Sequence, residues 1–261
     1  MAVKLLITTY KRVDKQITLP ALLEAGLEPT LVVQAREERV YRQAYPDVPM
    51  LVLPPNIRRL APTRAYLIKR FRKHKLVLLD DDLSFFYRPD PNDWHLKQAG
   101  PKQLRRMFKE IDKYLDQYVH VGVSARGGNN LVEQPYAINT RYMRVLCYNC
   151  PKLPSGLQIE RAGDMGDFDV NLQLLRKGYP NLVLYKYAQD HPGTQWVGGC
   201  SAYRTLQLHN RIVKKMAVWH KGFVRVREKH NKTGGEFGHR LELTIYWKKA
   251  YESSKASGRK K

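Results

Sequence analysis

The sequence has few cysteines and no long apolar run, and each shortage excludes a class of protein. Its 261 residues include three cysteines, Cys147, Cys150 and Cys200, too few for a disulfide framework. Cys147 and Cys150 have the spacing of half a zinc knuckle, but no second pair follows, so we expect reduced thiols. No apolar run approaches the roughly 18 residues of a membrane-spanning helix, and no signal peptide is visible. We therefore expect a soluble, cytoplasmic protein without a membrane partner.

Acidic residues are scarce relative to basic ones. Lys and Arg total 46 against 24 Asp and Glu, which gives a formal net charge of +22. This excess indicates a polyanionic partner, which is nucleic acid, an anionic membrane surface or a phosphorylated substrate. Hydrophobic residues make up 43% of the chain, enough for a sizeable buried core.

Short apolar runs alternate with helical patterns along most of the chain. We expect strands at 3–8, 30–33, 50–53, 75–80, 119–124, 141–148 and 182–187. We expect helices at 19–27, 36–44, 58–73, 101–118, 167–177 and 203–219. This alternation predicts an α/β fold with a mostly parallel central sheet flanked by helices.

The composition changes after about residue 228 and becomes polar and glycine-rich. We expect one catalytic domain over residues 1–230 and a C-terminal extension over 231–261. Within the extension, 241–247 is an amphipathic piece, and the basic tail 253–261 is expected to be disordered.

The densest negative charge in this basic chain lies at the end of an apolar run. The run 76–79 leads directly into Asp80, Asp81 and Asp82. Adjacent carboxylates repel one another and resist burial, so they need compensation. Mg²⁺ or Mn²⁺ suits carboxylate oxygens, especially when substrate phosphates complete the coordination shell. A solvated acidic turn, or salt bridges to nearby Lys and Arg, is the plainer alternative.

The order of motifs along the chain resembles the nucleotide-sugar glycosyltransferases of the GT-A fold, which are Rossmann-like. A first strand ends in the polar turn Ile7-Thr-Thr-Tyr-Lys-Arg12, and Arg64 lies on a helix just before the acidic strand. The cluster Gly163-Asp-Met-Gly-Asp-Phe-Asp169 opens a later helix, and His191 lies beyond it.

Three further segments narrow this resemblance. The stretch Asp167–Asn181, the stretch Gly198-Gly-Cys-Ser-Ala-Tyr-Arg-Thr205 and the stretch Phe223-Val-Arg-Val-Arg227 look like the TET-associated glycosyltransferases of phages. That family is related to the base J glucosyltransferase of kinetoplastids, and the resemblance covers roughly residues 3–228. The family class often has Glu-Asp where this chain has Gly166-Asp167.

The resemblance implies an activity and its partners. We expect metal-dependent transfer of a sugar from a UDP-sugar, with UDP-glucose as the expected donor, onto a hydroxyl in double-stranded DNA. The acceptor would be a 5-hydroxymethylpyrimidine, either 5-hydroxymethylcytosine or 5-hydroxymethyluracil. For a phage-encoded enzyme the location would be the host cytoplasm.

The resemblance also implies roles for individual residues on the donor side. Asp82 would be the direct ligand of Mn²⁺ or Mg²⁺, Asp80 would be a further metal contact, and His191 would contact the metal or the diphosphate. Asp80 would also reach ribose or uracil, assisted by Asp81. A lone histidine is more often structural, so His191 keeps that alternative. The remaining expected contacts to the nucleotide are Thr8, Thr9, Arg12 and Arg64.

Attack by a hydroxyl needs a general base within hydrogen-bond reach. We expect Asp167 in this role, with Asp169 second, because a helix N-terminus presents a carboxylate and stabilises its charge. Asp164 also stays open, and an ordinary first-turn carboxylate is the alternative for all of them.

The acceptor side is indicated by charge and aromatic residues. Basic residues recur at 58–75, 102–113 and 204–229, and we expect them to follow DNA phosphates around the cleft. The aromatic residues expected to receive a base taken out of the stack are Tyr136, Tyr142, Tyr148, Trp196, Tyr203 and Trp219. Three other functions remain open: a transferase with a lipid or protein acceptor, a metal-dependent nuclease, and a non-catalytic DNA-binding module.

Overall fold

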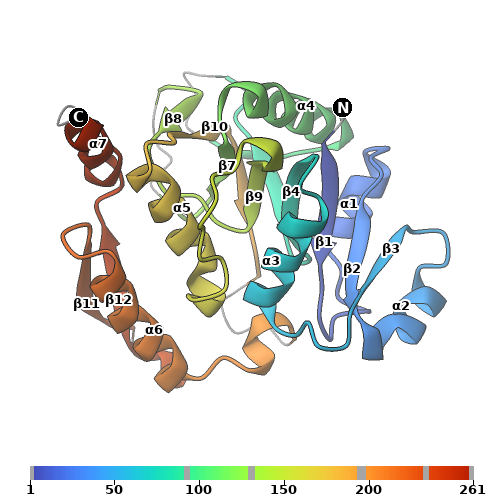
Figure 1. Ribbon diagram of the computed structural model, residues 1–261. Coiled ribbons are helices and arrows are strands. Elements are labelled where there is room, and N and C mark those ends of the chain that lie inside the picture. Colours follow the sequence, from blue (N-terminus) through green and yellow to red (C-terminus); the bar gives the residue numbers. More distant parts are fainter. Residues whose placement is uncertain (1–2, 91–94, 129–132, 193–197, 232–234, 259–261) are drawn as a thin grey trace.

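The computed structural model describes residues 3–90, 95–128, 133–192, 198–231 and 235–258 (Figure 1). Its centre is a ten-stranded sheet with the order β3-β2-β1-β4-β9-β7-β10-β5-β6, and β8 pairs with β10. A second, two-stranded sheet pairs β11 with β12. Trp196, one of the expected base-stacking residues, lies outside the described residues.

The strands of the large sheet follow the apolar runs of the sequence. Their bounds are β1 Lys4–Thr8, β2 Thr30–Gln34, β3 Met50–Leu53, β4 Lys75–Asp80, β5 Ser84–Tyr87, β6 Lys97–Gln98, β7 His120–Ala125, β8 Tyr136–Ile138, β9 Val145–Asn149 and β10 Asn181–Asp190. β1 is parallel to β2 and β4, β2 is parallel to β3, and β7 is parallel to β10. β9 lies antiparallel between β4 and β7, so these two strands also share a direction. The expected α/β fold with a mostly parallel sheet is confirmed.

Helices cover both faces of the sheet. Their bounds are α1 Thr18–Glu24, α2 Glu38–Ala44, α3 Leu60–Arg70, α4 Pro101–Gln117, α5 Gly166–Arg176, α6 Leu206–Trp219 and α7 Trp247–Gly258. One apolar core joins the sheet to α1 and α4, and it includes Leu22 and Ile111. A second core on the opposite face joins the sheet to α3 and α5, and it includes Leu67 and Leu174. These four helices therefore bury an apolar side against the sheet, as an amphipathic pattern predicts.

The C-terminal segment is more ordered than its composition suggests. β11 Val224–His230 and β12 His239–Ile245 form a hairpin, and the expected domain boundary after residue 230 falls between these paired strands. A third apolar core joins α5, α6, the hairpin and α7. Most of the tail expected to be disordered, residues 253–258, belongs to α7, so that prediction is wrong for these residues. The reason is packing, because Ala250 is fully buried and Tyr251 packs against the third core.

The described residues contain neither a membrane-spanning helix nor a disulfide. None of their helices combines the length and the apolar character needed to cross a bilayer. Cys147 on β9 and Cys150 just after it are free, buried thiols, and burial raises the pKa of Cys150 to about 12. A thiol with that pKa stays protonated near neutral pH.

Candidate active site

The candidate site lies where β1 and β4 end. Thr8 pairs with Asp80 across these parallel strands, so the turns that follow both strands open at one edge of the sheet. The run 76–79 is at most 2% exposed, and this burial fixes the position of the carboxylates that follow. A cavity of about 550 Å³ opens at this edge. Ligands of open α/β sheets bind at the same location, outside the carboxyl ends of the strands.

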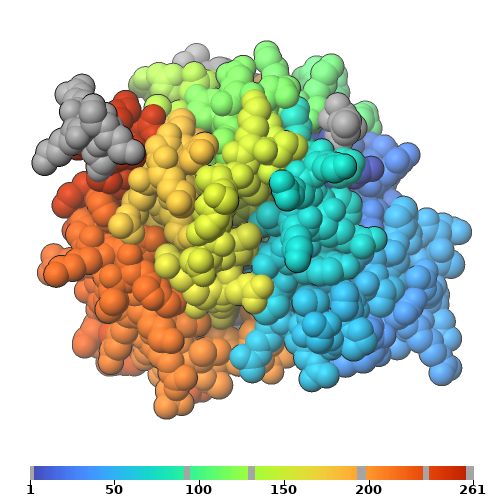
Figure 2. All heavy atoms as spheres, viewed as in Figure 1, coloured from blue at the N-terminus to red at the C-terminus, as the bar shows by residue number. Residues whose placement is uncertain are grey.

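Two parts of the chain line the cavity. We call residues 8–82 of the lining the first wall and residues 141–240 the second wall. The first wall includes Thr8, Thr9, Tyr10, Arg12, Gln34, Arg36, Arg58, Arg59, Arg64 and Asp80–Asp82. The second wall includes Arg141, Arg144, Asp164, Asp167, Phe168, His191, Gly199–Ser201, Tyr203, Arg204, His209, Phe237 and Arg240. α3 contacts the turn before α5, and Figure 2 shows these cyan and yellow segments side by side.

Arg12 binds two of the three clustered carboxylates. Its Nη1 donates to Asp81 Oδ1 and to Asp82 Oδ2, each at 2.7 Å. Thr9 Oγ1 donates to Asp81 Oδ2 at 2.6 Å and also meets the hydroxyl of Tyr41 at 2.8 Å. Burial raises the pKa of Asp81 to about 6, and the charge of Arg12 opposes this rise. Thr9 therefore lines the cavity while orienting Asp81.

Gly198 and Gly199, in the segment before α6, hold Arg12 in place. Arg12 Nη2 donates to the carbonyl oxygen of Gly198 at 3.4 Å. A Cβ added at Gly198 would lie 2.6 Å from Arg12 Cγ, and one at Gly199 would lie 3.0 Å from Arg12 Cζ. Both glycines also have a positive φ, 87° and 57°. Only glycine at these positions allows the backbone to approach the guanidinium so closely.

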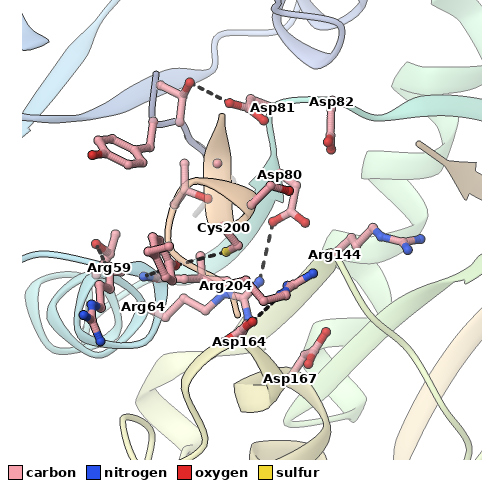
Figure 3. Close-up of a pocket in the computed structure, with 18 of the residues that line it drawn as sticks. Arg59, Arg64, Asp80, Asp81, Asp82, Arg144, Asp164, Asp167, Cys200 and Arg204 are labelled. Atoms are coloured by element: carbon pink, nitrogen blue, oxygen red, sulfur yellow. Dashed lines mark hydrogen bonds and ion pairs between the residues drawn. The ribbon is translucent and has the colours of Figure 1, made fainter. Parts of the chain in front are cut away.

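Arg64 lies beside the first carboxylate of the cluster, as Figure 3 shows. Its Nη2 is 3.5 Å from Asp80 Oδ1, and the whole residue is 5% exposed. Burial raises the pKa of Asp80, and the charge of Arg64 opposes the rise. Among the described residues, no acceptor meets the other terminal nitrogen, Nη1. A buried guanidinium nitrogen without an acceptor in the cavity wall is suited to an oxygen of an anionic ligand.

His191 follows β10 and contacts Arg144. Its Nε2 lies within hydrogen-bond distance of Arg144 Nη2, and Arg144 Nη1 donates to Gln189 Oε1 at 3.3 Å. Burial and the charge of Arg144 lower the pKa of His191, so its imidazole is neutral near pH 7. Its Nδ1 is buried and meets no partner in the described part of the chain. Because a guanidinium only donates, Nε2 accepts from Arg144 and Nδ1 carries the ring hydrogen, so this imidazole would have to leave Arg144 before it could bind a metal ion.

The two aspartates proposed for catalysis lie in different surroundings. Asp167 lines the cavity, where burial raises its pKa while Arg64 and Arg144 oppose the rise. Asp169 lies outside the cavity lining and is fully buried. It accepts hydrogen bonds from Arg161 at 2.7 and 2.8 Å and from Gln173 at 2.9 Å, and it meets His220 at 2.6 Å. Positions i and i+2 of a helix point in different directions, so one first turn holds a cavity residue and a core residue.

Asp164 also faces the cavity, but an arginine holds it. It forms an ion pair with Arg204, which Figure 3 shows beside Asp167. Burial lowers the pKa of Arg204, but its interactions with Asp164 outweigh burial and leave that pKa raised. Asp167 is therefore the carboxylate of this cluster that faces the cavity without a direct ion pair among the described contacts.

Arginine dominates the charge of the cavity. Among the described residues, nine arginines and five aspartates line it, with no lysine. The arginines are Arg12, Arg36, Arg58, Arg59, Arg64, Arg141, Arg144, Arg204 and Arg240. Guanidinium groups match phosphate oxygens in pairs, which makes this lining suitable for a phosphorylated ligand.

The protein itself supplies part of the positive charge that the acidic cluster needs. Arg12 and Arg64 pair with its three carboxylates, as the plainer interpretation of the sequence expected. Within the described ranges, no group of three or more His, Cys, Asp or Glu side chains is arranged to hold a metal ion. A role for Asp80, Asp82 and His191 as metal ligands remains a prediction.

Sequence reasoning missed much of the second wall. Arg141, Arg144 and Arg204 were not singled out, because they were placed inside the predicted strand 141–148 and helix 203–219, whereas in the structure they precede β9 and α6. Phe237 and Arg240 come from the segment interpreted as a polar extension. Their signal was the alternation of apolar and charged residues over 239–245, which is typical of a strand.

The expected base-stacking residues are largely elsewhere. Of the aromatic residues proposed, Tyr203 lines the cavity, whereas Tyr142 and Tyr148 are at most 2% exposed in the core beneath it. Tyr136 packs beside Tyr114, and Trp219 packs beside Arg161. The aromatic residues of the second wall besides Tyr203 are Phe168 and Phe237. Composition gives the number of tyrosines, but whether each one is buried depends on which side of its strand or helix it occupies.

The fold is that of the GT-A glycosyltransferases. A sequence model of the TET-Associated Glycosyltransferase family matches residues 3–199, and the chain belongs to that family. It is an enzyme of the glycosyltransferase class.

Two curated relatives and one solved structure show what the chain is similar to. The beta-glucosyl-HMC-alpha-glucosyl-transferases of Enterobacteria phages T6 and T2 are each 24% identical over 231 residues, covering 82% of this chain and 80% of the relative. The structure of S. aureus TarS residues 1–349 in complex with UDP-GlcNAc has a TM-score of 0.50 and 14% identity. That match covers 83% of this chain and 67% of TarS, and it supports the fold.

Proposed function

We propose that the chain transfers a hexose from a UDP-sugar onto a hydroxyl carried by a 5-hydroxymethylpyrimidine in DNA. The observation that carries this proposal is the cavity at the ends of β1 and β4, where arginines surround a carboxylate cluster. The names of the phage relatives place hydroxymethylcytosine on the acceptor side of those enzymes. The net charge of +22 favours a polyanionic acceptor such as DNA over a neutral small molecule. A phage-encoded enzyme of this kind acts in the host cytoplasm.

The first wall would bind the nucleotide. Thr8 and Arg12 lie at the end of β1, where the uridine of the donor is expected, and Thr9 orients Asp81. Arg64 Nη1 has no acceptor among the described residues, so it is our choice for a diphosphate oxygen. UDP-glucose is the expected donor, and the arginine-rich lining suits its diphosphate.

Several residues fit a divalent cation at the cluster. Asp82 binds Arg12 through Oδ2, and the neutral imidazole of His191 would offer the lone pair of Nε2 once that atom leaves Arg144. Asp82 and Asp80, with His191, would hold Mn²⁺ or Mg²⁺, and the donor diphosphate would complete the shell. When bound, the cation would stabilise the negative charge of the departing diphosphate. Arg12 would keep Asp81 and Asp82 oriented before the donor binds.

Asp167 is our choice for the general base. The acceptor oxygen forms a bond to the anomeric carbon as the bond to the diphosphate breaks, and its proton passes to the Asp167 carboxylate. A raised pKa makes this carboxylate a stronger base near neutral pH. Asp169 is committed to Arg161, Gln173 and His220 and would support the helix from the core.

The names of the relatives favour a second acceptor. They describe α-glucosyl transfer onto a hydroxymethylcytosine that already carries a β-glucosyl group. In that case the nucleophile is a sugar hydroxyl, and an α-product from an α-linked donor retains its configuration. The departing diphosphate, next to Arg64, would then take the proton in place of Asp167. The anomeric configuration of the product separates the two routes.

The test is a panel of donors and acceptors. The enzyme is incubated with UDP-glucose, UDP-galactose or UDP-GlcNAc and with unmodified, hydroxymethylated or β-glucosylated hydroxymethylated duplex DNA. Nucleosides are then analysed by mass, and the linkage is determined by anomer-specific glycosidases. We expect a hexose on a modified acceptor and none on unmodified DNA. No added hexose on either modified acceptor with any donor would overturn the proposal.

Two controls address the other functions that the sequence left open. Supercoiled plasmid with Mg²⁺ or Mn²⁺ should stay intact, whereas nicking would favour a nuclease. Activity should fall on treatment with EDTA and return with Mn²⁺, and Asp82→Asn should remove the effect of Mn²⁺ on UDP binding. Asp14→Asn, an exposed aspartate outside the cavity lining, is the matched control. UDP binding that ignores Mn²⁺ in the parent enzyme would refute the metal role.

A further inference from the structure

The β11–β12 hairpin has two chemically different faces. On one face, Val224, Leu243 and Ile245 pack toward α6 in the third apolar core. Because side chains alternate along a strand, the intervening residues form the opposite face. Figure 1 shows the hairpin on the far side of the molecule from β3.

We call this opposite face the outer face, and its charge is basic. Arg225 and Arg227 are exposed, and the Lys229 side chain is 37% exposed. One carboxylate, Glu242, lies among them and pairs with Arg227 at 3.1 Å, Lys229 at 3.2 Å and Arg240 at 2.7 Å. Among the described residues of this face, Arg225 adds a fourth cation, which leaves an excess of three positive charges on a short two-stranded ribbon.

The outer face leads directly into the cavity. Lys229 pairs with Arg240 across the two strands, and Arg240 lines the cavity. Arg240 Nη1 donates to the carbonyl oxygen of Phe237 at 2.9 Å, and Phe237 also lines the cavity, next to His209. A ligand that follows the outer face therefore reaches the second wall at Arg240.

We propose that the outer face of the hairpin binds the phosphate backbone of duplex DNA and delivers the acceptor nucleotide to the cavity at Arg240 and Phe237. This inference rests on the proposed function, because it names the surface by which that site reaches its acceptor. Alternate residues of a strand are about 6.6 Å apart, so Arg225 to Lys229 span about 13 Å, or about four base-pair steps. Two-stranded β-ribbons of this width also fit the major groove.

The basic surface of α4 lacks this connection to the cavity in the described part of the chain. The exposed lysines of α4, Lys102, Lys109 and Lys113, match the hairpin in number of charges. However, α4 packs on the sheet face that holds α1, and none of its residues is among the described lining of the cavity. The expectation that 102–113 borders the cleft is therefore not supported by the structure. These lysines provide a matched control because they change net charge equally at another place.

The experiment compares two triple variants of the full chain. One is Arg225→Gln, Arg227→Gln and Lys229→Gln, and the other is Lys102→Gln, Lys109→Gln and Lys113→Gln. Binding to a fluorescein-labelled, unmodified duplex is measured by anisotropy over a range of salt concentrations. Unmodified DNA is used so that binding is read without any transfer reaction.

We expect the hairpin variant to bind duplex about 100-fold more weakly at low salt. The plot of log K against log salt should become less steep by about 2.7, because each of the three lost phosphate contacts contributes about 0.9 to the magnitude of the slope. The α4 variant should bind like the parent. Unchanged melting temperature and unchanged UDP affinity in both variants would show that fold and donor site are intact.

The possible outcomes separate this inference from the proposed function. Equal weakening in both variants, or no weakening in the hairpin variant, would overturn the hairpin as the docking surface even if hexose transfer is found. Hairpin-dependent binding of duplex without hexose transfer would support the docking surface and remove the proposed acceptor chemistry. If the hairpin variant loses structure, the single change Arg227→Gln replaces it, with a slope decrease of about 0.9 as the supporting result. An unchanged slope overturns the inference.

Discussion

Arg12 Nη1 lies 2.7 Å from Asp82 Oδ2, although the two residues are 70 positions apart in the chain. Arg12 follows β1 and Asp82 follows β4, so the contact depends on the parallel pairing of these strands. The same nitrogen meets Asp81 at 2.7 Å, and all three side chains are at most 10% exposed. One guanidinium therefore compensates two buried carboxylates that would otherwise repel each other.

Removing this guanidinium should destabilise the fold. We expect Arg12→Ala to lower the free energy of unfolding by about 3–5 kcal/mol, because it leaves buried charge without compensation. The measurement is urea denaturation at pH 7.5. The loss should shrink as pH falls and the carboxylates become protonated.

The control for Arg12 is Arg42→Ala, which removes an exposed pair with Glu38. That pair should contribute at most about 0.5 kcal/mol. A similar small loss for Arg12→Ala at neutral pH would show that the carboxylates find other compensation.

Replacing Gly198 by alanine should displace the side chain of Arg12. The new Cβ would lie 2.6 Å from Arg12 Cγ and from the carbonyl oxygen of Lys11, and φ is +87°. We expect weaker UDP binding by calorimetry and a larger loss of stability than backbone strain alone gives. Gly222→Ala is the matched control, since its φ is +86° and nothing lies within 4 Å of the added Cβ. Gly222→Ala should cost about 1–2 kcal/mol with UDP affinity unchanged. Equal effects of the two changes would contradict the contact.

Asp167 and Asp169 should respond differently to the same change. Asp167→Asn should leave the melting temperature near that of the parent and lower kcat by about 100-fold or more, if Asp167 is the base. Asp169→Asn should leave Arg161 and His220 without their carboxylate and lower stability by about 3 kcal/mol. Thermal melts and initial rates, measured below the melting point of each variant, give both quantities. A folded Asp169→Asn enzyme with the larger loss of kcat would reverse the assignment.

Asp81 should make stability depend on pH. Burial raises its pKa from 3.8 to about 6 in the folded state, so the folded protein favours the protonated carboxyl. Its contribution to stability is therefore fully present below about pH 4 and is lost as pH rises through about 6. The measurement is the difference in unfolding free energy between the parent and Asp81→Asn, followed from pH 4 to pH 8.

As pH rises through this window, the parent should lose unfolding free energy relative to Asp81→Asn. Thr9→Val removes a hydrogen bond that favours the charged carboxylate, so it should move the transition to higher pH. The raised pKa of Asp81 would be contradicted if the parent kept the same stability relative to Asp81→Asn at every pH, or gained stability relative to it as pH rises.

The first wall was largely predictable from local sequence. An apolar run that ends in three aspartates can lie only at the end of a buried strand, and Thr8, Arg12 and Arg64 lie in neighbouring motifs. All three line the cavity. These residues lie together because parallel strands bring their carboxyl ends to one edge, so chain order along the α/β pattern translates into position; their contacts to a nucleotide stay a prediction.

The second wall was not predictable in the same way. Asp167 and Asp169 share one helical turn, and only the packing of α5 decides which side chain faces the cavity and which meets Arg161. Phe237 and Arg240 reach the cavity because the hairpin packs on α6. No local pattern encodes that packing, in which His209 meets the carbonyl oxygen of Leu241, 32 positions away.

By itself, the sequence determined the alternation of strands and helices, the basic character of the chain and the carboxylate cluster at the end of β4. These follow from the period of apolar residues and from composition, which are local properties. The tertiary structure alone decided that Arg12 stands between Asp81 and Asp82, that Asp169 is a core residue, and that the C-terminal hairpin completes the cavity. Those outcomes depend on long-range packing and on pairing of buried charges, whose energies exist only once distant segments meet.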